Sequence, residues 1–333
     1  MFLSVPIIPH HATLRSTWRA VSRSQGPFLT TQIDHLRGQI IRLYADVATV
    51  QVGDARVECA IRGKLFKADP PAVGDYVTLE ESGDGYVIAG LLPRKSELKR
   101  RAAGSTVKSQ VLMANIDQVM LVFAAANPPI TPAKVDRFLV VAEANHLQAQ
   151  IIVNKMDLAE GDEVRSLFRV YQNAGYVIHY ASVRTGEGLD EVKQALEGKV
   201  SVLVGPSGVG KSSLLNALYP GLDLKVGQVS EAYGKGRHTT VGGYLINLPG
   251  GAQVADTAGL REIGLWMVPP EELPYCFPEF QPYIGECRFN DCAHLTEPGC
   301  AILEALQEGK IDPSRHESYT KLRAEAVETF PRW

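Results

Sequence analysis

The sequence lacks three features that would place a protein in a membrane or outside the cell. No hydrophobic run is long enough to span a bilayer. Residues 1–33 have no secretory hydrophobic core, and they contain no Asp or Glu. The chain of 333 residues has only 5 cysteines, and an odd number argues against a disulfide framework. These absences favour a reducing compartment and predict a cytoplasmic protein with no membrane partner.

The N-terminal extension, residues 1–36, is basic rather than hydrophobic. It carries Arg15, Arg19 and Arg23 before its first acidic residue, Asp34. This composition has some likeness to an organellar transit peptide. We instead interpret the segment as an extension that is disordered or touches RNA; a start site assigned too far upstream is a further alternative.

The length and charge of the chain limit its possible domain organisation. A chain of 333 residues predicts two or three domains, and 45% hydrophobic with 21% charged residues is ordinary for a globular protein. We expect a monomer, because the sequence has no heptads. The net charge of −3 hides a basic run, since residues 94–108 hold six Lys or Arg against one Glu. Such a run can meet RNA phosphates, but a solvated basic linker over residues 97–115 is the favoured interpretation.

Hydrophobic periodicity divides the rest of the chain into three domains. Residues 37–96 contain short alternating segments between Gly, Asp and Pro turns, which predicts a small β-barrel, OB-like with SH3-like as the alternative. In residues 116–266, apolar strands alternate with helices, which predicts an α/β domain with a parallel sheet covered on both faces. Residues 267–333 are rich in Pro and Cys and end in a predicted helix over Ser314–Thr329.

A phosphate-binding loop is the most specific motif in the chain. The stretch GPSGVGKS fits G-x-x-x-x-G-K-[ST] in full, with a predicted strand before it and a predicted helix after it. Glycines let backbone N–H groups turn toward phosphates, and the helix N-terminus adds positive potential. We expect Lys211 to reach the β- and γ-phosphates and Ser212 to ligate Mg²⁺. The predicted nucleotide contacts of this loop are Gly205, Pro206, Ser207, Gly208, Val209, Gly210, Lys211, Ser212 and Ser213.

Guanine specificity is predicted from NKMD, residues 154–157, which follows an apolar strand. The Asp157 carboxylate can accept from guanine N1–H and the exocyclic amine, whereas adenine would leave it unpaired at a cost of ~1–3 kcal/mol. Asn154 would brace the loop, and the Lys155 stem would pack over the base. The match is weak alone but strong beside a phosphate loop. A second loop, ASVRTGEGL, offers the backbone of Ser182 and Val183 to guanine O6, although alone it is a generic connection.

Magnesium and switch residues are predicted downstream. DTAG ends a strand, so Asp256 would hold Mg²⁺ through a water and Gly259 would contact the γ-phosphate. Between the phosphate loop and DTAG lies YGKGRHTTV, where Thr239 or Thr240 would close on Mg²⁺. The guanine loops thus precede the phosphate loop, the reverse of the usual order. Joining the old termini and opening the chain after DTAG preserves the same sheet, so we predict a circularly permuted GTPase domain.

A metal site is predicted near the C-terminus. Three cysteines and one histidine lie within 14 residues, a set that suits tetrahedral Zn²⁺ with no open position, so the site would be structural. The predicted ligands are Cys287, Cys292, His294 and Cys300. Cys59 and Cys276 are expected to be core residues.

The combination of permuted order, GRHTT segment, N-terminal barrel and C-terminal Cys/His cluster resembles the RsgA (YjeQ) family of ribosome small-subunit-dependent GTPases. The resemblance covers roughly residues 37–330. It implies an OB-fold, a permuted GTPase and a zinc domain, acting in late maturation of the small ribosomal (30S) subunit, which stimulates GTP hydrolysis. Two positions depart from the expected motifs: Ala258 replaces the family's usual Pro in DTPG, and Leu260 stands where Ras-like enzymes place a water-orienting Gln.

Because leucine cannot orient a water, intrinsic hydrolysis should be slow. His238 is the candidate for that role, against the alternative of a solvated or capping histidine. The leading hypothesis is an enzyme that binds the small subunit and its rRNA with GTP and leaves after hydrolysis. The alternative is a non-switching RNA-binding scaffold in which GTP is a structural ligand.

Overall fold

The computed structural model describes residues 36–62, 69–83, 85–101, 109–224, 244–256 and 268–329. These residues all belong to one compact unit, Leu36–Trp333. The N-terminal extension and the predicted switch residues His238, Thr239, Thr240 and Gly259 lie outside the described residues. Within the described part of the chain, no helix is both long enough and apolar enough to cross a membrane.

The N-terminal domain is a closed five-stranded barrel, as the alternating pattern predicts. Its strands are β1 (Leu36–Tyr44), β2 (Val47–Val52), β3 (Ala55–Ala60), β4 (Tyr76–Ser82) and β5 (Gly85–Leu91). The order is β1-β2-β3-β5-β4, and β4 returns to pair with β1. Inward-facing residues such as Ile40, Val50, Val77 and Ile88 fill the interior, and Cys59 is buried among them.

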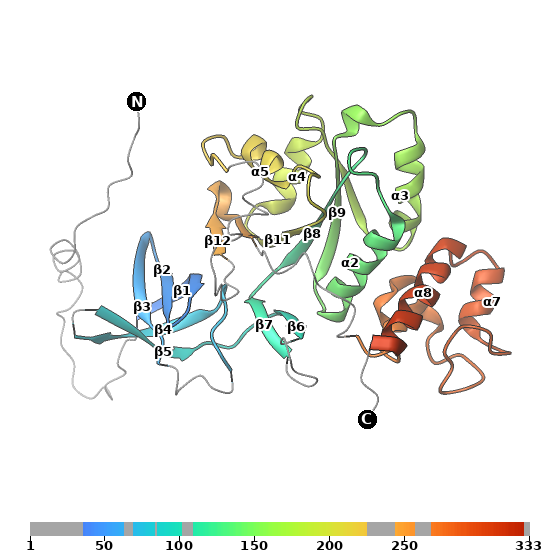
Figure 1. Ribbon diagram of the computed structural model, residues 1–333, viewed down its shortest axis with the longest axis horizontal. Helices are drawn as coiled ribbons and strands as arrows, with labels where there is room; N and C mark the ends of the chain where they lie inside the picture. Colours follow the sequence, from blue (N-terminus) through green and yellow to red (C-terminus); the bar gives the residue numbers. More distant parts are fainter. Residues whose placement is uncertain are drawn as a thin grey trace, which may run out of the picture. The chain divides into compact units, whose positions relative to one another are not determined.

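The central domain is a mainly parallel sheet between two layers of helices (Figure 1). Its strands are β8 (Gln118–Ala124), β9 (Gln148–Asn154), β10 (Val177–Tyr180), β11 (Val200–Val204), β12 (Tyr244–Asn247) and β13 (Gln253–Asp256). They lie in the order β10-β9-β8-β11-β13-β12, with only β12 antiparallel among these six. The carboxyl ends of the five parallel strands therefore meet at one edge, where ligands bind in open α/β sheets.

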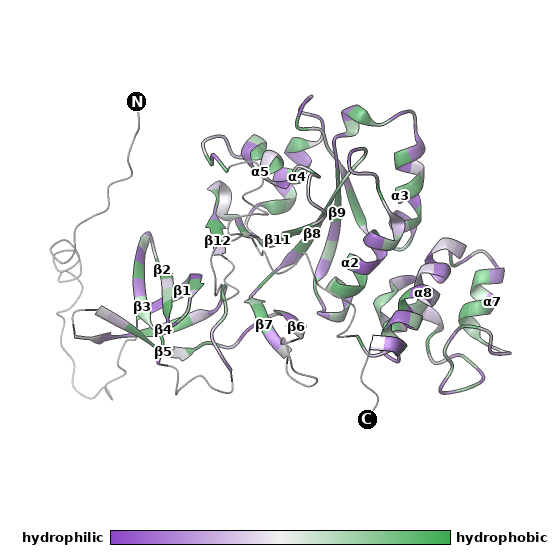
Figure 2. Ribbon diagram, viewed as in Figure 1, coloured by the Kyte–Doolittle hydropathy of each residue, from purple (hydrophilic) through white to green (hydrophobic). Residues whose placement is uncertain are grey.

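Helices cover both faces of this sheet and bury separate hydrophobic clusters. They are α2 (Pro132–Ala144), α3 (Glu163–Asn173), α4 (Leu189–Leu196) and α5 (Lys211–Leu218), with short 3₁₀ turns η1 (Met156–Leu158) and η2 (Pro249–Gly251). Helices α2 and α3 pack on one cluster, and α4 and α5 pack on the other. Every residue of β8 is buried, and Figure 2 shows hydrophobic colour along most of β8 and β9. Pro132 opens α2, and the N-cap residue Thr131 makes no side-chain capping bond.

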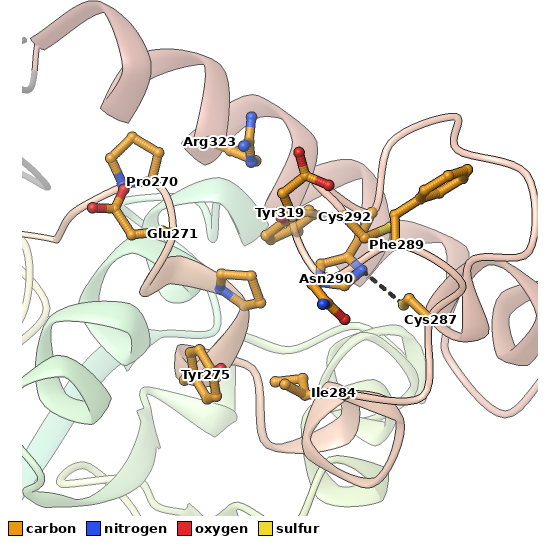
Figure 3. A pocket seen from close by; sticks show the side chains of 14 residues that line it. Pro270, Glu271, Tyr275, Ile284, Cys287, Phe289, Asn290, Cys292, Tyr319 and Arg323 are labelled. Atoms are coloured by element: carbon orange, nitrogen blue, oxygen red, sulfur yellow. Dashed lines mark hydrogen bonds between the residues drawn. The ribbon is translucent and has the colours of Figure 1, made fainter.

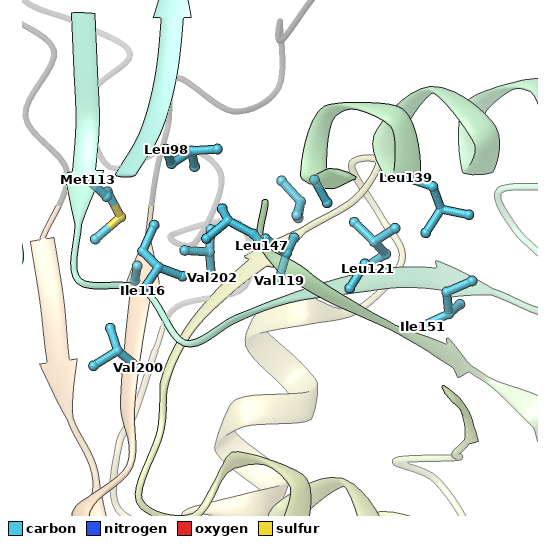
Figure 4. Close-up of a cluster of buried hydrophobic side chains, with 14 of the residues drawn as sticks. Leu98, Met113, Ile116, Val119, Leu121, Leu139, Leu147, Ile151, Val200 and Val202 are labelled. Carbon is cyan, nitrogen blue, oxygen red and sulfur yellow. The ribbon is translucent and has the colours of Figure 1, made fainter. Parts of the chain in front are cut away.

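A β-hairpin occupies part of the segment that was interpreted as a basic linker. Strands β6 (Glu97–Arg101) and β7 (Ser109–Ala114) pair antiparallel, and residues 102–108 between them lie outside the described residues. Leu98 and Met113 are buried and join the same cluster as Val119 and Leu139 of the central domain (Figure 4). Leu98 and Met113 lie opposite each other across the hairpin, so this part of it belongs to the core.

The C-terminal domain packs short 3₁₀ turns against two helices. These elements are η5 (Leu273–Cys276), η6 (Pro278–Tyr283), α7 (Ala301–Gln307) and α8 (Pro313–Thr329). Phe277, Phe280 and Tyr319 stack at its centre, with ring centroids 5.0–5.5 Å apart. Cys276 is buried, as expected, and α8 begins one residue before the predicted helix.

Candidate nucleotide and metal sites

The phosphate loop joins the carboxyl end of β11 to the first turn of α5. Gly205 has a φ of +148°, and a Cβ there would lie 2.0 Å from the Val122 carbonyl oxygen of β8. Gly208 and Gly210 also have positive φ, at +81° and +94°. Only glycine suits these positions, so the motif's glycines are required for the loop to pass this close to the neighbouring strand.

Lys211 lies over the loop that it follows. Its Nζ donates to the carbonyl oxygens of Gly205 at 2.7 Å and Pro206 at 2.9 Å, and the side chain is mostly buried. Ser212, the next residue of α5, is also buried. The lysine and serine of the motif thus lie beside the phosphate loop, at the first turn of α5.

The guanine loop is bound directly to the phosphate loop. Asn154 ends β9 with only 1% of its surface exposed, and its Nδ2 donates to the Val209 carbonyl oxygen at 2.9 Å. A Cβ at Gly210 would lie 2.6 Å from that same Nδ2. Asn154 Oδ1 is buried with no hydrogen-bond partner in the described part of the chain, which leaves one polar atom for a ligand. The two motifs, 55 residues apart, therefore form one site.

Lys155 makes a second connection between the loops. It has a left-handed backbone with φ of +60°, and its Nζ donates to the carbonyl oxygens of Gly208 at 2.7 Å and Asn127 at 2.5 Å. Its stem consequently lies across the space between the guanine loop and the phosphate loop, as the predicted packing over a base requires.

The Asp157 carboxylate is held in place by the second guanine loop. Its Oδ1 accepts from Ser182 Oγ at 2.5 Å, and its Oδ2 accepts from Arg184 Nε at 2.6 Å. The hydrogen bond from Ser182, and then that from Arg184, lower the pKa of Asp157 below its ordinary value despite partial burial. The carboxylate is therefore ionised at neutral pH and able to accept from a base.

Ser182 acts differently from its predicted role. Its backbone N–H donates to the Glu187 carbonyl oxygen at 2.9 Å, so this amide is not directed at a base. Its hydroxyl, instead, orients Asp157 and also accepts from the Thr185 N–H at 3.2 Å. The predicted backbone contact to guanine O6 therefore remains a prediction for Val183 alone.

The loop after β8 belongs to the site but was not predicted from its sequence. Asn127 has a φ of +49° and supplies a carbonyl oxygen to Lys155, and Pro128 lies 3.8 Å from where a Cβ of Gly208 would be. The available signal was AANPP directly after a fully buried strand, at the edge where parallel strands end.

Asp256 can be placed by its backbone. It ends β13, which runs parallel to β11 with Ala255 opposite Val202. The carboxyl end of β13 consequently lies beside the strand that leads into the phosphate loop, at the edge predicted for magnesium.

The four predicted metal ligands come together near the start of α7. All their ligand atoms lie within 4.8 Å of one another. His294 Nδ1 is 3.5 Å from the sulfur atoms of both Cys287 and Cys300, and these sulfurs are 3.9 Å apart. Zn–S bonds of about 2.3 Å and a Zn–N bond of about 2.05 Å at tetrahedral angles put S and N about 3.5 Å apart and two sulfurs about 3.8 Å apart. The donor set thus fits a tetrahedral zinc ion.

Comparison with known proteins agrees with this combination of sites. The family model described as RsgA GTPase matches residues 91–266. The chain belongs to the RsgA GTPase family. It is therefore a GTPase, and its guanine and phosphate loops occupy the permuted order of that family.

Relatives match most of the chain. It is 48% identical over 279 residues to "Small ribosomal subunit biogenesis GTPase RsgA" of Gemmatimonas aurantiaca, covering 82% of this chain and 91% of the relative. The protein of the same name in Caldanaerobacter subterraneus subsp. tengcongensis is 39% identical, covering 90% and 99%.

Solved structures have the same fold. YjeQ from Thermotoga maritima is similar with a TM-score of 0.72 and 35% identity, over 88% of this chain and 99% of that one. YloQ, described as a circularly permuted GTPase, gives 0.70 and 30%, over 92% and 100%.

The metal cluster of this RsgA-family chain is supported by surrounding hydrogen bonds. His316 Nε2 bonds the carbonyl oxygen of His294 at 2.8 Å, and Tyr319 donates to that of Ala293 at 2.7 Å. Glu297 accepts backbone N–H groups of residues 293, 295 and 296. Burial acts to raise the pKa of Glu297, but these donors outweigh it and lower the pKa to about 2. The loop that carries the imidazole is therefore fixed by its own backbone.

A hollow of about 310 Å³ lies beside the cluster (Figure 3). Its walls come from Pro270–Tyr275, Cys287–Cys292 and the α8 residues Tyr319 and Arg323. The hollow gives the metal ligands a side that faces solvent, which provides an entry path for an ion.

Proposed function

We propose that this GTPase acts in biogenesis of the small ribosomal subunit. It docks on the subunit with GTP bound, the subunit and its rRNA stimulate hydrolysis, and hydrolysis drives release. The relatives carry small ribosomal subunit biogenesis in their names. The observation that carries the nucleotide part is the Asn154–Val209 hydrogen bond, which joins the guanine and phosphate loops into one site.

The nucleotide would be held from both ends. At the base, Asp157 accepts from guanine N1–H and N2–H₂, Asn154 contacts the base through its buried amide, and Lys155 covers the ring. At the phosphates, the backbone N–H groups of residues 207–213 donate, and Lys211 moves its ammonium from the loop carbonyls to the β- and γ-phosphates.

Magnesium would be held by Ser212, with Asp256 through a water and Thr239 or Thr240 from the switch segment. Ser212 and the end of β13 both lie at the carboxyl edge of the sheet, and hydroxyl and carboxylate oxygens are the donors Mg²⁺ prefers. When bound, the ion neutralises charge that develops on the phosphates. In the proposed mechanism, Gly259 contacts the γ-phosphate. His238 orients the attacking water, because Leu260 cannot.

Zinc is the proposed resident metal of the C-terminal domain. With three thiolates and one imidazole, its coordination would be complete, so the ion would stabilise the domain rather than take part in hydrolysis. We also place the protein in the cytoplasm as a monomer.

Steady-state hydrolysis with and without purified small subunits tests the proposal. We expect a slow basal rate that small subunits raise by at least tenfold. Lys211→Ala should abolish both rates, whereas Lys134→Ala, an exposed lysine on α2, should change neither. Equal rates with and without subunits would favour the alternative, a scaffold that holds GTP as a structural ligand. His238→Ala with unchanged stimulated turnover would remove that residue from the mechanism.

A change of base tests the guanine site separately. Asp157→Asn replaces one acceptor by a donor, which suits xanthine because xanthine carries an oxygen where guanine carries its exocyclic amine. The variant should lose at least tenfold in GDP affinity and gain in affinity for xanthosine diphosphate. Unchanged preference for GDP would show that Asp157 does not contact the base.

A further inference from the structure

Arg184 binds the atom of Asp157 that a guanine base also needs. Its Nε donates to Asp157 Oδ2 at 2.6 Å, while Ser182 occupies Oδ1 from the buried side. The Asp157 side chain is 7% exposed, whereas that of Arg184 is 71% exposed. The acceptor is therefore fixed, and its outer partner sits on a solvent-exposed arm that can move away.

The two partners have the same chemistry. The edge of guanine that a carboxylate recognises is N1–H and N2–H₂ on one carbon, which is a guanidine fragment. An arginine side chain ends in a guanidinium with the same planar fork of donors. Arg184 also reaches the Asp157 carbonyl oxygen, with Nη2 at 3.5 Å. Both the base and Arg184 consequently seek the outer oxygen of this carboxylate.

We propose that Arg184 is a built-in competitor of guanine at Asp157 and sets the nucleotide affinity of the free protein. A base that binds must displace the guanidinium and replace its hydrogen bond. This inference rests on the proposed guanine contact of Asp157. It adds a residue that weakens nucleotide binding, whereas the residues proposed above strengthen it.

The size of the effect follows from the exposure of the pair. Ion pairs with one exposed partner contribute about 0.2–1 kcal/mol, which corresponds to a roughly 1.4- to 5-fold change in affinity. Salt screens such a pair, so the effect should shrink as ionic strength rises. Lysine at this position would keep the charge but lose the fork, and should give an intermediate affinity.

The experiment is a titration of the full chain with a fluorescent GDP analogue, with dissociation rates by displacement. Arg184→Ala should bind about two- to fivefold more tightly than wild type at low salt, with the difference falling below twofold in 1 M salt. Arg184→Lys should lie between them. Arg165→Ala is the matched control, because Arg165 forms another exposed pair in this region, with Glu187 at 3.4 Å. It should bind as wild type does.

The outcomes separate the two proposals. Wild type that binds GDP while Arg184→Ala binds no more tightly overturns the competitor role alone. Weaker binding by Arg184→Ala overturns it as well, and would show that the guanidinium contacts the base. Wild type that binds no guanine nucleotide overturns the guanine site and this inference with it. Thermal unfolding of each variant shows whether a loss reflects folding.

Discussion

The central domain is joined to its two neighbours in different ways. Its connection to the barrel combines backbone hydrogen bonds with uncharged side-chain contacts, such as the bond from Gln253 Nε2 to Gln39 Oε1 and the burial of Ile41 in the central cluster. The Ala114 N–H donates to the Val73 carbonyl at 2.9 Å, and β1 pairs with β12 at Arg42 and Tyr244. A Cβ at Gly74 would lie 2.0 Å from the Ala114 carbonyl oxygen, so the two chains pass in close contact.

The connection to the C-terminal domain contains buried charge beside a hydrophobic contact of Val140 on α2. Arg315 of α8 is 1% exposed and forms ion pairs with Asp136 of α2 and with Glu279, the latter at 2.5 Å. Ser318 donates to the other oxygen of Asp136, and the Arg315 guanidinium lies 4.7 Å from the Phe277 ring centroid. Burial raises the pKa of Asp136, against the opposing effect of Arg315.

The two connections, here called joints, should differ in which substitutions they tolerate. Backbone contacts depend little on side-chain identity, so the barrel joint should survive most substitutions. The second joint is sensitive at Arg315, because removal of one member of a buried pair leaves an uncompensated charge. Helix α2 also starts just after the Asn127 loop, which touches Lys155. The sensitive joint is thus on a helix that begins a few residues after a loop of the nucleotide site.

Loss of the metal should have the largest effect, because it should unfold one of the two neighbouring domains and leave the other folded. Cys300→Ala removes a ligand, and structural zinc sites contribute about 10–16 kcal/mol of binding free energy that folding uses. We expect the C-terminal domain to unfold while the barrel and the GDP site remain. Circular dichroism, protease mapping and GDP titration check this, with Cys59→Ala as a control that leaves the metal ligands intact. Simultaneous loss of GDP binding would show that the domains do not unfold separately.

Arg315→Met should come next. It leaves Asp136 and Glu279 without their partner, at a cost of about 3–5 kcal/mol. Denaturant unfolding should show this as a lower midpoint. The double variant Arg315→Met with Asp136→Leu should recover part of the loss, because the stranded charge is gone. Failure to recover would mean that the pair is not the source of the cost.

Arg94→Ala tests a buried ion pair on the barrel side of the first joint, where Arg94 also bonds Glu97 of the hairpin. Arg94 forms two bonds to Asp75, at 2.7 and 2.8 Å, and Asp75 is fully buried. Asp75 still accepts from the Ala72 N–H at 2.7 Å, so we expect a smaller loss, about 1–3 kcal/mol. A loss equal to that of Arg315→Met, in the same unfolding assay, would contradict the distinction between the joints.

Arg137→Ala should have the smallest effect. Arg137 and Glu325 form a bidentate pair at 2.7 and 2.5 Å, but both side chains are 34% exposed, so the pair contributes about 0.5 kcal/mol. The bond from Arg137 lowers the pKa of Glu325. The stabilisation is therefore present above the ordinary glutamate pKa and is lost as pH falls through the lowered value. Unfolding midpoints of wild type and variant should differ at pH 7 and converge in acid.

The sequence predicted those parts that local patterns determine. The alternating strands of the barrel, the apolar strands of the central domain and the C-terminal helix are all found. The phosphate loop joins a strand to a helix, and the four metal ligands come together. Both were predictable because the residues of each motif lie within a short stretch of chain. The Asn154–Val209 bond follows from the common edge of a parallel sheet.

Other parts depend on partners far along the chain. Asp136 and Arg315 are 179 residues apart, and no local pattern distinguishes this arginine from an exposed one. The charge of the basic run predicts a solvated linker by default, whereas Leu98 is buried by residues far along the chain, such as Val119 and Leu139. Arg184 likewise looked like an ordinary loop residue, since its contact with Asp157 spans 27 residues.

The pairing of β1 with β12 has a practical consequence for dissecting the protein. Strand β12 is the edge strand of the central domain's own sheet, and β1 pairs with its outer side at Arg42 and Tyr244. If residues 116–266 were expressed alone, that side would expose unpaired N–H and C=O groups, which recruit strands from other molecules. The barrel therefore also acts as a shield against self-association, and a fragment that begins before β1 should stay dispersed where the isolated domain aggregates.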